Sequence, residues 1–484
     1  MGDVRRGDPR SWVISIMAGA AAYVTCSHYL FFAGGVWQLP LFVGMLVGLV
    51  SLVPVQAAVV SVGCMLGGML LSAPLVPRHL APDLTAYVLA VALSAIGGMA
   101  PGLLRSALHG PSRRRLTLGL SALLVAWAIL NMWMPLFDAG VPSQGYGSLK
   151  ASAVRENPAP GSSINDDALY RRIFYLMRDG RSYYVAYNEA WKDTLGQQAP
   201  NPNSPTGVRL PTYYWFWRLL PADAFAIVYL YLAFASVGTV AASFVAGQLV
   251  GVRLAPLAAT TFAAYALAVG LTVGALYVDL PAMSVALVGI ALFLRAVRTR
   301  QTRVVWAAAA TLALAALTRE ILAYVIVLAA LSALLQPTGE RGRWALPWLA
   351  ALGAFALGYA AHVVAVWPYI TPGAAGVSYL KGGVAFVADG LTRFSAGMAG
   401  RGTTLAAFVA LGVTGAVASR RRAGNAFSAF AVASIVLPFV VMLRVGNPGV
   451  DAQGTIYNYW GMLVVPLALA LWPAAALLVA PKRE

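Results

Sequence analysis

The residues best suited to chemistry lie in one hydrophilic segment of the chain, residues 138–214. This segment holds seven of the 17 acidic residues, among them the adjacent pair Asp166 and Asp167. A carboxylate can accept a proton from a hydroxyl group. The same segment is rich in tyrosine and tryptophan, which form platforms for sugar rings. It therefore combines candidate proton acceptors with candidate sugar-binding surfaces.

Each of these features also has an ordinary structural explanation. The apolar residues between positions 164 and 180 recur at helical spacing, which predicts a short amphipathic helix that Gly180 closes and that lies at the membrane interface. Asp166 and Asp167 fall in its first turn, where they complement the helix dipole. The aromatic run Tyr213 to Trp217 is typical of a belt at the level of the lipid headgroups.

Other charged residues fall beside or within apolar runs. Asp279 precedes a helix in the sequence Tyr-Val-Asp-Leu-Pro, and Arg319 and Glu320 interrupt a long apolar stretch. Asp279 can be a helix-start residue, and Arg319 and Glu320 can form an internal ion pair near membrane depth. Arg444 precedes the last apolar run. His362 lies alone near a helix end, which indicates packing rather than catalysis.

The composition identifies the type of chain that must position these residues. Of the 484 residues, 60% are hydrophobic and only 11% are charged, whereas a soluble domain has about 25% charged residues. Repeated continuous apolar runs of about 20 residues are typical of membrane-spanning helices and not of a transmembrane barrel. The composition excludes a soluble globular enzyme, a disordered chain and a disulfide-stapled module.

The apolar runs predict an all-α polytopic membrane protein with about 14 transmembrane helices. Their approximate positions are 12–32, 38–52, 54–75, 84–104, 116–136, 222–247, 255–276, 281–297, 304–318, 321–336, 344–366, 401–418, 425–443 and 459–479. The long hydrophilic segment, taken as an outer loop over 138–214, separates the first five helices from the other nine.

The charges predict the orientation. If the N-terminus is cytoplasmic, the loops on that side hold 19 of the 34 basic residues and four of the 17 acidic residues. Short basic loops stay on the cytoplasmic side, so we expect both termini to be cytoplasmic and residues 138–214 to face outward. The net charge of +17 is then mostly a topology signal, and no nucleic-acid partner is expected.

Several short motifs, taken in order, resemble those of the GT-C glycosyltransferases, the polyprenyl-phosphate-dependent membrane enzymes that include protein mannosyltransferases and aminoarabinose transferases. The matching pieces are Asp166-Asp167-Ala168-Leu169-Tyr170, Gly180-Arg181-Ser182-Tyr183-Tyr184, Arg209-Leu210-Pro211, Tyr277-Val278-Asp279-Leu280-Pro281 and Thr318-Arg319-Glu320. The resemblance covers about residues 116–480, a GT-C-like core. Residues 1–115 form an accessory region of about four helices that the pattern does not include, and the acidic pair follows the fifth helix by about 30 residues rather than closely.

The resemblance implies sugar transfer, with inversion, from a polyprenyl-phosphate donor to an acceptor hydroxyl at the outer face of a bacterial plasma membrane. The acceptor would be an envelope glycan, lipid or protein. The implied roles are general base for Asp166 or Asp167, binding of the donor phosphate for Arg319 and Arg444, orientation of the acceptor or of a metal for Asp279 and Glu320, and substrate contact for Tyr170, Tyr183, Tyr184 and Arg209. The resemblance leaves room for a divalent cation but assigns no metal ligands, and no nucleotide or dinucleotide motif occurs.

A multi-pass transporter or lipid flippase is the main alternative. It would also have many helices and a few intramembrane charges. Transporters commonly contain paired structural repeats with a binding site at the midplane. No convincing internal repeat is found here, and the ionisable residues gather at outer helix ends, which favours chemistry at one face of the membrane.

Overall fold

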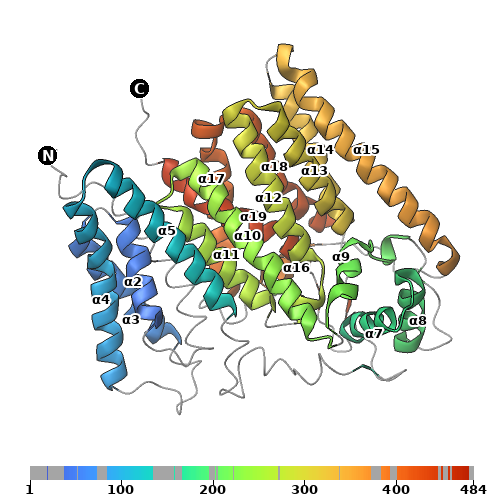
Figure 1. Cartoon of the computed structure of the whole chain (residues 1–484), viewed down its shortest axis with the longest axis horizontal. Coiled ribbons are helices and arrows are strands. Elements are labelled where there is room, and N and C mark those ends of the chain that lie inside the picture. Colours follow the sequence, from blue (N-terminus) through green and yellow to red (C-terminus); the bar gives the residue numbers. More distant parts are fainter. Residues whose placement is uncertain are drawn as a thin grey trace.

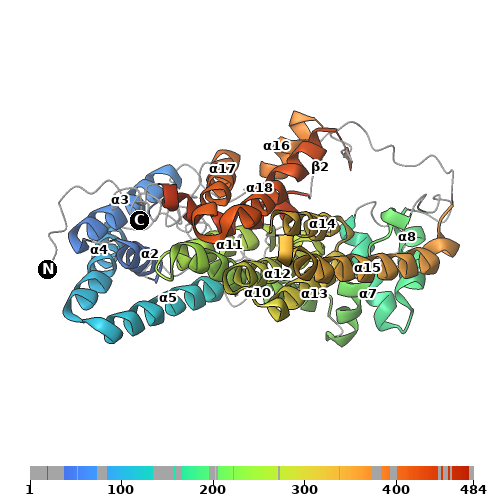
Figure 2. The same cartoon turned by 90° about the horizontal axis from the view of Figure 1, so that it is seen from above.

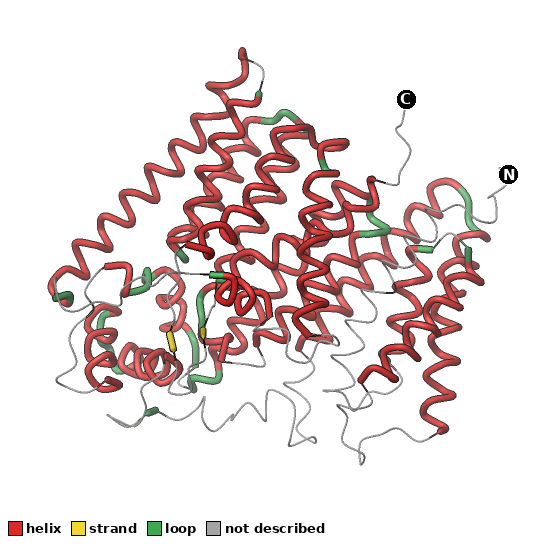
Figure 3. Tube along the Cα trace, turned by 180° about the vertical axis from the view of Figure 1, so that it is seen from behind, coloured by secondary structure: helices red, strands yellow, loops and turns green. Residues whose placement is uncertain are grey.

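The computed structural model describes residues 19, 38–51, 53–72, 84–133, 157–158, 166–195, 202, 205–221, 223–270, 273–336, 338–371, 383–392, 401–444, 449–450, 456–457 and 460–478. Within these ranges the chain forms seventeen α-helices, and its strands are the antiparallel pair β1 (Gly449–Val450) and β2 (Ile456–Tyr457). Helices make up nearly all of the described chain (Figure 3). The predicted all-α class is confirmed.

Seven helices in the described ranges are long and apolar enough to cross a membrane: Val88–Ala107, Gly110–Trp133, Ala226–Val250, Asp279–Thr299, Arg341–Tyr369, Arg420–Arg444 and Gly461–Leu478. Six shorter apolar helices accompany them. These are the helices of a multi-pass membrane protein. Thirteen of the predicted intervals coincide with such helices, and the first, 12–32, lies outside the described residues apart from residue 19. The total of 14 spans stays a prediction.

The first described helices pack closely through glycine. They are α2 (Gln38–Val50), α3 (Pro54–Ser72), α4 (Leu84–Ala107) and α5 (Gly110–Trp133). A Cβ atom on Gly97 of α4 would lie 2.8 Å from the carbonyl oxygen of Leu41 in α2. Because packing between membrane helices relies on close backbone approach, glycine is needed at such a contact. Helices α2, α3 and α4 lie together at one side of the molecule (Figures 1 and 2).

The loop predicted between the two groups of helices contains helices of its own. They are α7 (Asp166–Arg178), α8 (Tyr183–Leu195), η4 (Pro205–Gly207), α9 (Thr212–Trp215) and η5 (Phe216–Leu219). The predicted amphipathic helix is confirmed as α7, which buries Leu169, Ile173, Leu176 and Met177. Gly180 follows it with a φ of 92°, a conformation that suits glycine.

The aromatic run of this loop packs mostly inward. Tyr213, Tyr214 and Trp217 are fully buried, whereas Trp215 is 56% exposed. Membership of an aromatic belt therefore fits Trp215 but not its buried neighbours. The buried residues instead fill the space between the loop helices and the bundle.

The remaining helices form the main bundle. They are α10 (Ala226–Val250), α11 (Ala255–Gly270), η6 (Val273–Leu276), α12 (Asp279–Thr299), α13 (Thr302–Thr318), η7 (Glu320–Leu322), α14 (Ala323–Ser332), η8 (Ala333–Leu335), η9 (Thr338–Glu340), α15 (Arg341–Val366), η10 (Trp367–Tyr369), α16 (Val384–Thr392), α17 (Arg401–Ala418), α18 (Arg420–Arg444), α19 (Gly461–Leu471) and η12 (Trp472–Leu478). At its centre, α10 contacts α11, α12 and α19, and α12 also contacts α13 and α19. Figure 1 shows α7, α8 and α9 at the end of the bundle to which α15 descends.

A tight turn between α12 and α13 determines where the candidate site lies. Arg300 ends α12 in the left-handed conformation, with φ 56° and ψ 23°, and α13 begins at Thr302. The two helices are therefore antiparallel neighbours of 21 and 17 residues. This arrangement returns the end of α13 to the start of α12. Asp279 and Arg319 lie together although 40 residues separate them in the chain.

Candidate functional site

Four charged residues from three parts of the chain form a connected ion cluster, which consists of Arg209, Asp279, Arg319 and Glu320. The Nε of Arg319 donates to Oδ1 of Asp279 at 2.7 Å, and its Nη1 donates to Oε1 of Glu320. The Nη1 of Arg209 lies 3.6 Å from the same Glu320 oxygen. The cluster contains two formal positive and two formal negative charges.

The break between α13 and α14 allows Arg319 to reach both carboxylates. The backbone of Arg319 is extended, with φ −142° and ψ 106°, and the short 3-10 turn η7 follows. Asp279 is the first residue of α12, where a carboxylate also complements the helix dipole. The side chains of Arg319 and Asp279 are each 2% exposed, and that of Glu320 is 15% exposed. The second oxygen of Glu320 is buried without a hydrogen-bond partner among the described residues.

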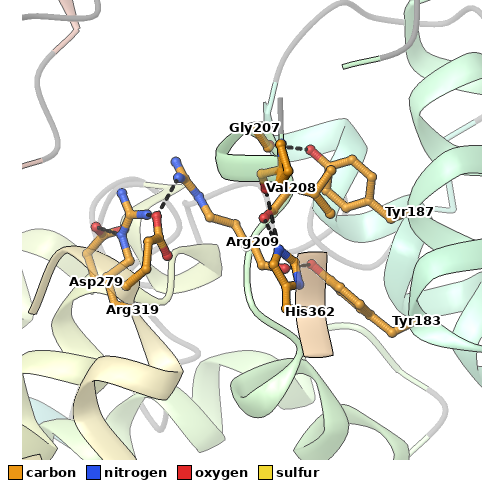
Figure 4. Close-up of polar contacts among 10 residues, drawn as sticks. Tyr183, Tyr187, Gly207, Val208, Arg209, Asp279, Arg319 and His362 are labelled. Carbon is orange, nitrogen blue, oxygen red and sulfur yellow. Dashed lines mark hydrogen bonds and ion pairs between the residues drawn. The ribbon is translucent and has the colours of Figure 1, made fainter. Parts of the chain in front are cut away.

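Arg209 reaches the cluster from a loop whose backbone is fixed by side chains. Three successive carbonyl oxygens, those of Gly207, Val208 and Arg209, each form a side-chain hydrogen bond. Tyr187 donates to Gly207 at 2.9 Å and Tyr183 donates to Arg209 at 2.8 Å. His362 Nε2 lies 3.1 Å from the oxygen of Val208. Figure 4 shows these contacts on one side of the loop and the Arg209 guanidinium extending toward Arg319 on the other.

His362 joins this loop to α8 and α15. Its Nδ1 lies 3.0 Å from the hydroxyl of Tyr184, while its Nε2 faces the loop carbonyl of Val208. If Nε2 carries the proton, it donates to the carbonyl and Nδ1 accepts from the tyrosine. The ring is 2% exposed. The buried ring packs as expected, and the structure adds its hydrogen bonds to Tyr184 and to the loop carbonyl.

Stacked tyrosines lie beside the cluster. The ring of Tyr214 is sandwiched between Tyr170 of α7, at a centroid distance of 5.7 Å, and Tyr183 of α8, at 5.1 Å. Tyr170 also meets the edge of Tyr277, two residues before Asp279. The faces of Tyr170 and Tyr183 are therefore covered by other rings. Of the three tyrosines predicted to touch substrate, Tyr184 alone is partly exposed.

The cluster and the tyrosines perturb one another electrostatically. Burial lowers the pKa of Arg209, but Tyr170, Glu320 and Asp279 outweigh it, so the pKa lies well above its ordinary value. Burial and the neighbouring Tyr187, Tyr170 and Tyr184 raise the pKa of Tyr183 well above its ordinary value. Arg209 thus carries a permanent positive charge, and its side chain is still 26% exposed.

The structure places the other predicted site residues as follows. Asp166 and Asp167 open α7, but their side chains are outside the described part of the structure. By helical spacing, both positions lie about one turn before Tyr170 on the same face of α7. Arg444 ends α18 and is exposed, and among the described residues no ion pair joins it to the cluster. The structure therefore joins Arg209, Asp279, Arg319 and Glu320.

The carboxylates of the cluster do not form a cage for a metal ion. Asp279 and Glu320 both contact Arg319, and the described ranges contain no group of three or more His, Cys, Asp or Glu side chains that could hold a metal ion. A divalent cation bound by these side chains alone does not fit the donor set present.

Two residues that shape the site, His362 and Tyr187, were not among the predicted site residues. His362 contacts the carbonyl of Val208, 154 residues away in the chain, and Tyr187 donates to the carbonyl of Gly207. Both support the backbone of the Arg209 loop. The one signal in the sequence was the Gly-x-x-Tyr-Tyr segment ahead of Arg-x-Pro, which placed the tyrosines and the arginine in one loop.

Comparison of the chain with known protein families, with curated proteins and with solved structures finds no match.

Proposed function

We propose that the protein is a GT-C-like glycosyltransferase that moves a sugar from a polyprenyl-phosphate donor to an acceptor hydroxyl at the outer face of the membrane, with inversion. The observation that carries the proposal is the ion cluster at one end of the helix bundle, beside the tyrosines of α7 and α8. It gathers cations suited to a phosphate at the end of a membrane bundle, where a lipid-linked substrate reaches a water-facing acceptor. The neighbouring helix α7 begins with two acidic residues suited to proton transfer.

Arg209 is the cation that meets the donor phosphate first. Its guanidinium is 26% exposed, whereas the side chain of Arg319 is 2% exposed and engaged by two carboxylates. A guanidinium matches two oxygens of a phosphate group. The 3.6 Å contact between Arg209 and Glu320 is long, so a phosphate can replace it at a small cost. Arg319 is the buried cation of the cluster, and its charge stabilises the leaving phosphate.

The base is assigned to the acidic pair that opens α7. Tyr170 follows one turn later and contacts Tyr277, which places this face of α7 next to the start of α12. In the reaction, Asp166 or Asp167 takes the proton of the acceptor hydroxyl as its oxygen bonds to the anomeric carbon. The bond from that carbon to the phosphate oxygen breaks, and polyprenyl phosphate leaves. Arg444, as a second phosphate ligand, stays a prediction.

A lipid-binding experiment tests the donor class. The full-length protein in mild detergent is titrated with a polyprenyl monophosphate, and bound lipid is counted by native mass spectrometry for wild type, Arg209→Gln and Arg181→Gln. Arg181 is the matched control because it lies in the same loop region, is 57% exposed and pairs only with Glu189 among the described residues, at 3.5 Å. Loss of a charge-assisted contact is expected to weaken binding about tenfold or more in Arg209→Gln.

Equal binding by wild type and both variants would contradict the role of Arg209. Failure of wild type to bind any polyprenyl phosphate would contradict the donor class itself. The catalytic step is tested with Asp166→Asn and Asp167→Asn, because loss of transfer in one of them with retained lipid binding is the signature of a missing base. Full transfer activity in both variants would refute the assignment of the base to this pair.

Transport is the second candidate function, and one observation favours it. The cation of the cluster that lies deepest, Arg319, is neutralised by Asp279 and Glu320 at a break between two helices. Broken helices and paired intramembrane charges are common at transporter sites. Reconstitution in liposomes separates the two functions, because a transporter moves a lipid or solute across the bilayer without changing its covalent structure.

A further inference from the structure

A second group of arginines lies outside the ion cluster, at the end of α2. Arg105 of α4 donates to the carbonyl oxygen of Leu49 at 3.1 Å. Arg253, in the turn between α10 and α11, donates to Val50 at 2.7 Å and to Leu49 at 3.3 Å. The last carbonyls of a helix lack intrahelical partners and favour cations. Two guanidinium groups, one from α4 and one from the turn after α10, therefore converge on the last turn of α2.

The positive charge here exceeds what the helix end neutralises. A helix C-terminus carries about half a negative charge. Within the described ranges, no carboxylate forms an ion pair with Arg105 or Arg253, and the Nε of the 6% exposed Arg105 has no hydrogen-bond partner. Burial, with the nearby charges of Arg105 and Arg113, lowers the pKa of Arg253 to about 10. Arg253 therefore stays charged at neutral pH.

A cavity adjoins this group of arginines. It has a volume of about 290 Å³ and is lined by Arg113 and Arg114 of α5, with Thr117, Leu118, Gly110 and Val252. Val252 precedes Arg253, and its carbonyl accepts a hydrogen bond from Ser121 of α5 at 2.9 Å. The cavity and the arginines that cap α2 therefore share one corner of the fold. The charged residues that line this cavity or cap α2 are all arginines.

We propose that this corner, the arginine cluster of Arg105, Arg113, Arg114 and Arg253, binds the phosphate group of an anionic membrane lipid. Arg113 and Arg114 line the cavity and contact the phosphate, whereas Arg105 and Arg253, which cap α2, add positive charge behind it. Guanidinium groups bind phosphate oxygens in pairs. The surroundings favour a lipid over free phosphate, because Leu104 and Leu118 next to the cluster are 51% and 44% exposed and offer apolar surface to acyl chains. Basic pockets between membrane helices are suited to lipid headgroups.

The lipid site is separate from the proposed transferase site. Arg253 lies in the turn from which α11 leaves, and Asp279 follows the far end of α11. The proposal therefore does not rest on the proposed function. A lipid at this corner contacts α4, α5 and the turn between α10 and α11, and so joins the early helices to the main bundle.

The experiment uses the delipidated full-length protein in mild detergent. Phosphatidylglycerol, phosphatidylcholine and inorganic phosphate are the probes, and retained ligand is counted by native mass spectrometry. Arg113→Gln/Arg114→Gln is the test variant, because both residues are exposed and their loss does not uncap α2. Arg295→Gln/Arg303→Gln is the matched control, because it removes two exposed arginines from α12 and α13 without touching the cavity.

We expect wild type and control to retain phosphatidylglycerol in preference to phosphatidylcholine, and the test variant to bind it about 30-fold more weakly. Both variants should elute as wild type does in size-exclusion chromatography, so that a folding defect is recognised. Equal binding of phosphatidylglycerol by the test variant and control would overturn the proposal. Binding of inorganic phosphate as strong as that of the lipid would overturn the lipid assignment and identify free phosphate as the ligand.

Discussion

Removing the carboxylate of Asp279 tests how far the buried ion pair stabilises the bundle. Its Oδ1 accepts from Arg319 at 2.7 Å, and both side chains are 2% exposed. Asp279→Asn leaves the ion cluster with one positive charge in excess. Breaking a buried pair costs about 3–5 kcal/mol. Because Glu320 still contacts Arg319, we expect the free energy of unfolding to fall by the lower value, about 3 kcal/mol.

An exposed ion pair of similar length provides the control. Arg300 and Glu340 approach to 2.9 Å, but their side chains are 52% and 38% exposed. Solvent screening limits such a pair to about 0–1 kcal/mol, so Glu340→Gln should change stability little. Unfolding by dodecyl sulfate in detergent micelles, followed by tryptophan fluorescence, measures both variants. Equal losses in the two variants would show that burial does not decide the contribution and would refute the reasoning.

The double variant Asp279→Asn/Arg319→Gln examines the same reasoning through charge balance. Each single substitution leaves an uncompensated charge, whereas the double substitution leaves Arg209 and Glu320 as a balanced pair. We therefore expect the double variant to lose about 1–3 kcal/mol less stability than the sum of the two single losses. Strict additivity would mean that Asp279 and Arg319 do not act as a pair.

Three further predictions concern other parts of the fold. Gly97→Leu should separate α4 from α2 and lower the melting temperature. Gly63→Leu should leave the melting temperature unchanged, because a Cβ at Gly63 meets nothing within 4 Å. Thermal scans in detergent compare the two variants. His362→Phe should cost about 1–3 kcal/mol, measured by unfolding in dodecyl sulfate, because it leaves the hydroxyl of Tyr184 and a loop carbonyl without their partner. Burial raises the pKa of Tyr184 to about 12. Because the folded state favours the protonated phenol, the stabilisation that Tyr184 contributes is complete below about pH 10 and is lost as the pH rises to about 12. The raised pKa is measured as the difference in tyrosinate absorbance between wild type and Tyr184→Phe during an alkaline titration.

The helices were the part of the fold that the sequence predicted well. Continuous apolar runs are the requirement for spanning a bilayer, so each run marks a helix without knowledge of its neighbours. Their ends were less well predicted. The predicted interval 281–297 omits Asp279, which begins α12, because a charged residue stops a search for apolar runs although it favours a helix start.

The candidate site was predictable in part. The approach of Asp279 to Arg319 follows from two helices of similar length joined by a tight turn, and this pattern is visible in the sequence. The carbonyl contacts of residues 207–209 were not predictable. They depend on irregular backbone held by Tyr187, Tyr183 and His362, and irregular backbone has no periodicity for a sequence pattern to report.

The break at Arg319 links the stability of the bundle to the chemistry proposed for it. In a membrane, a helix can be interrupted only where its freed polar groups find partners. At this break, the carboxylates of Asp279 and Glu320 pair with the arginine side chain, and Thr212 of the loop donates to the carbonyl oxygen of Leu317 at 2.6 Å. The same contacts that make the interruption tolerable also hold a guanidinium and two carboxylates beside the partly exposed Arg209. Variants that weaken the site should therefore also weaken the contact between loop and bundle, and binding must be measured alongside stability.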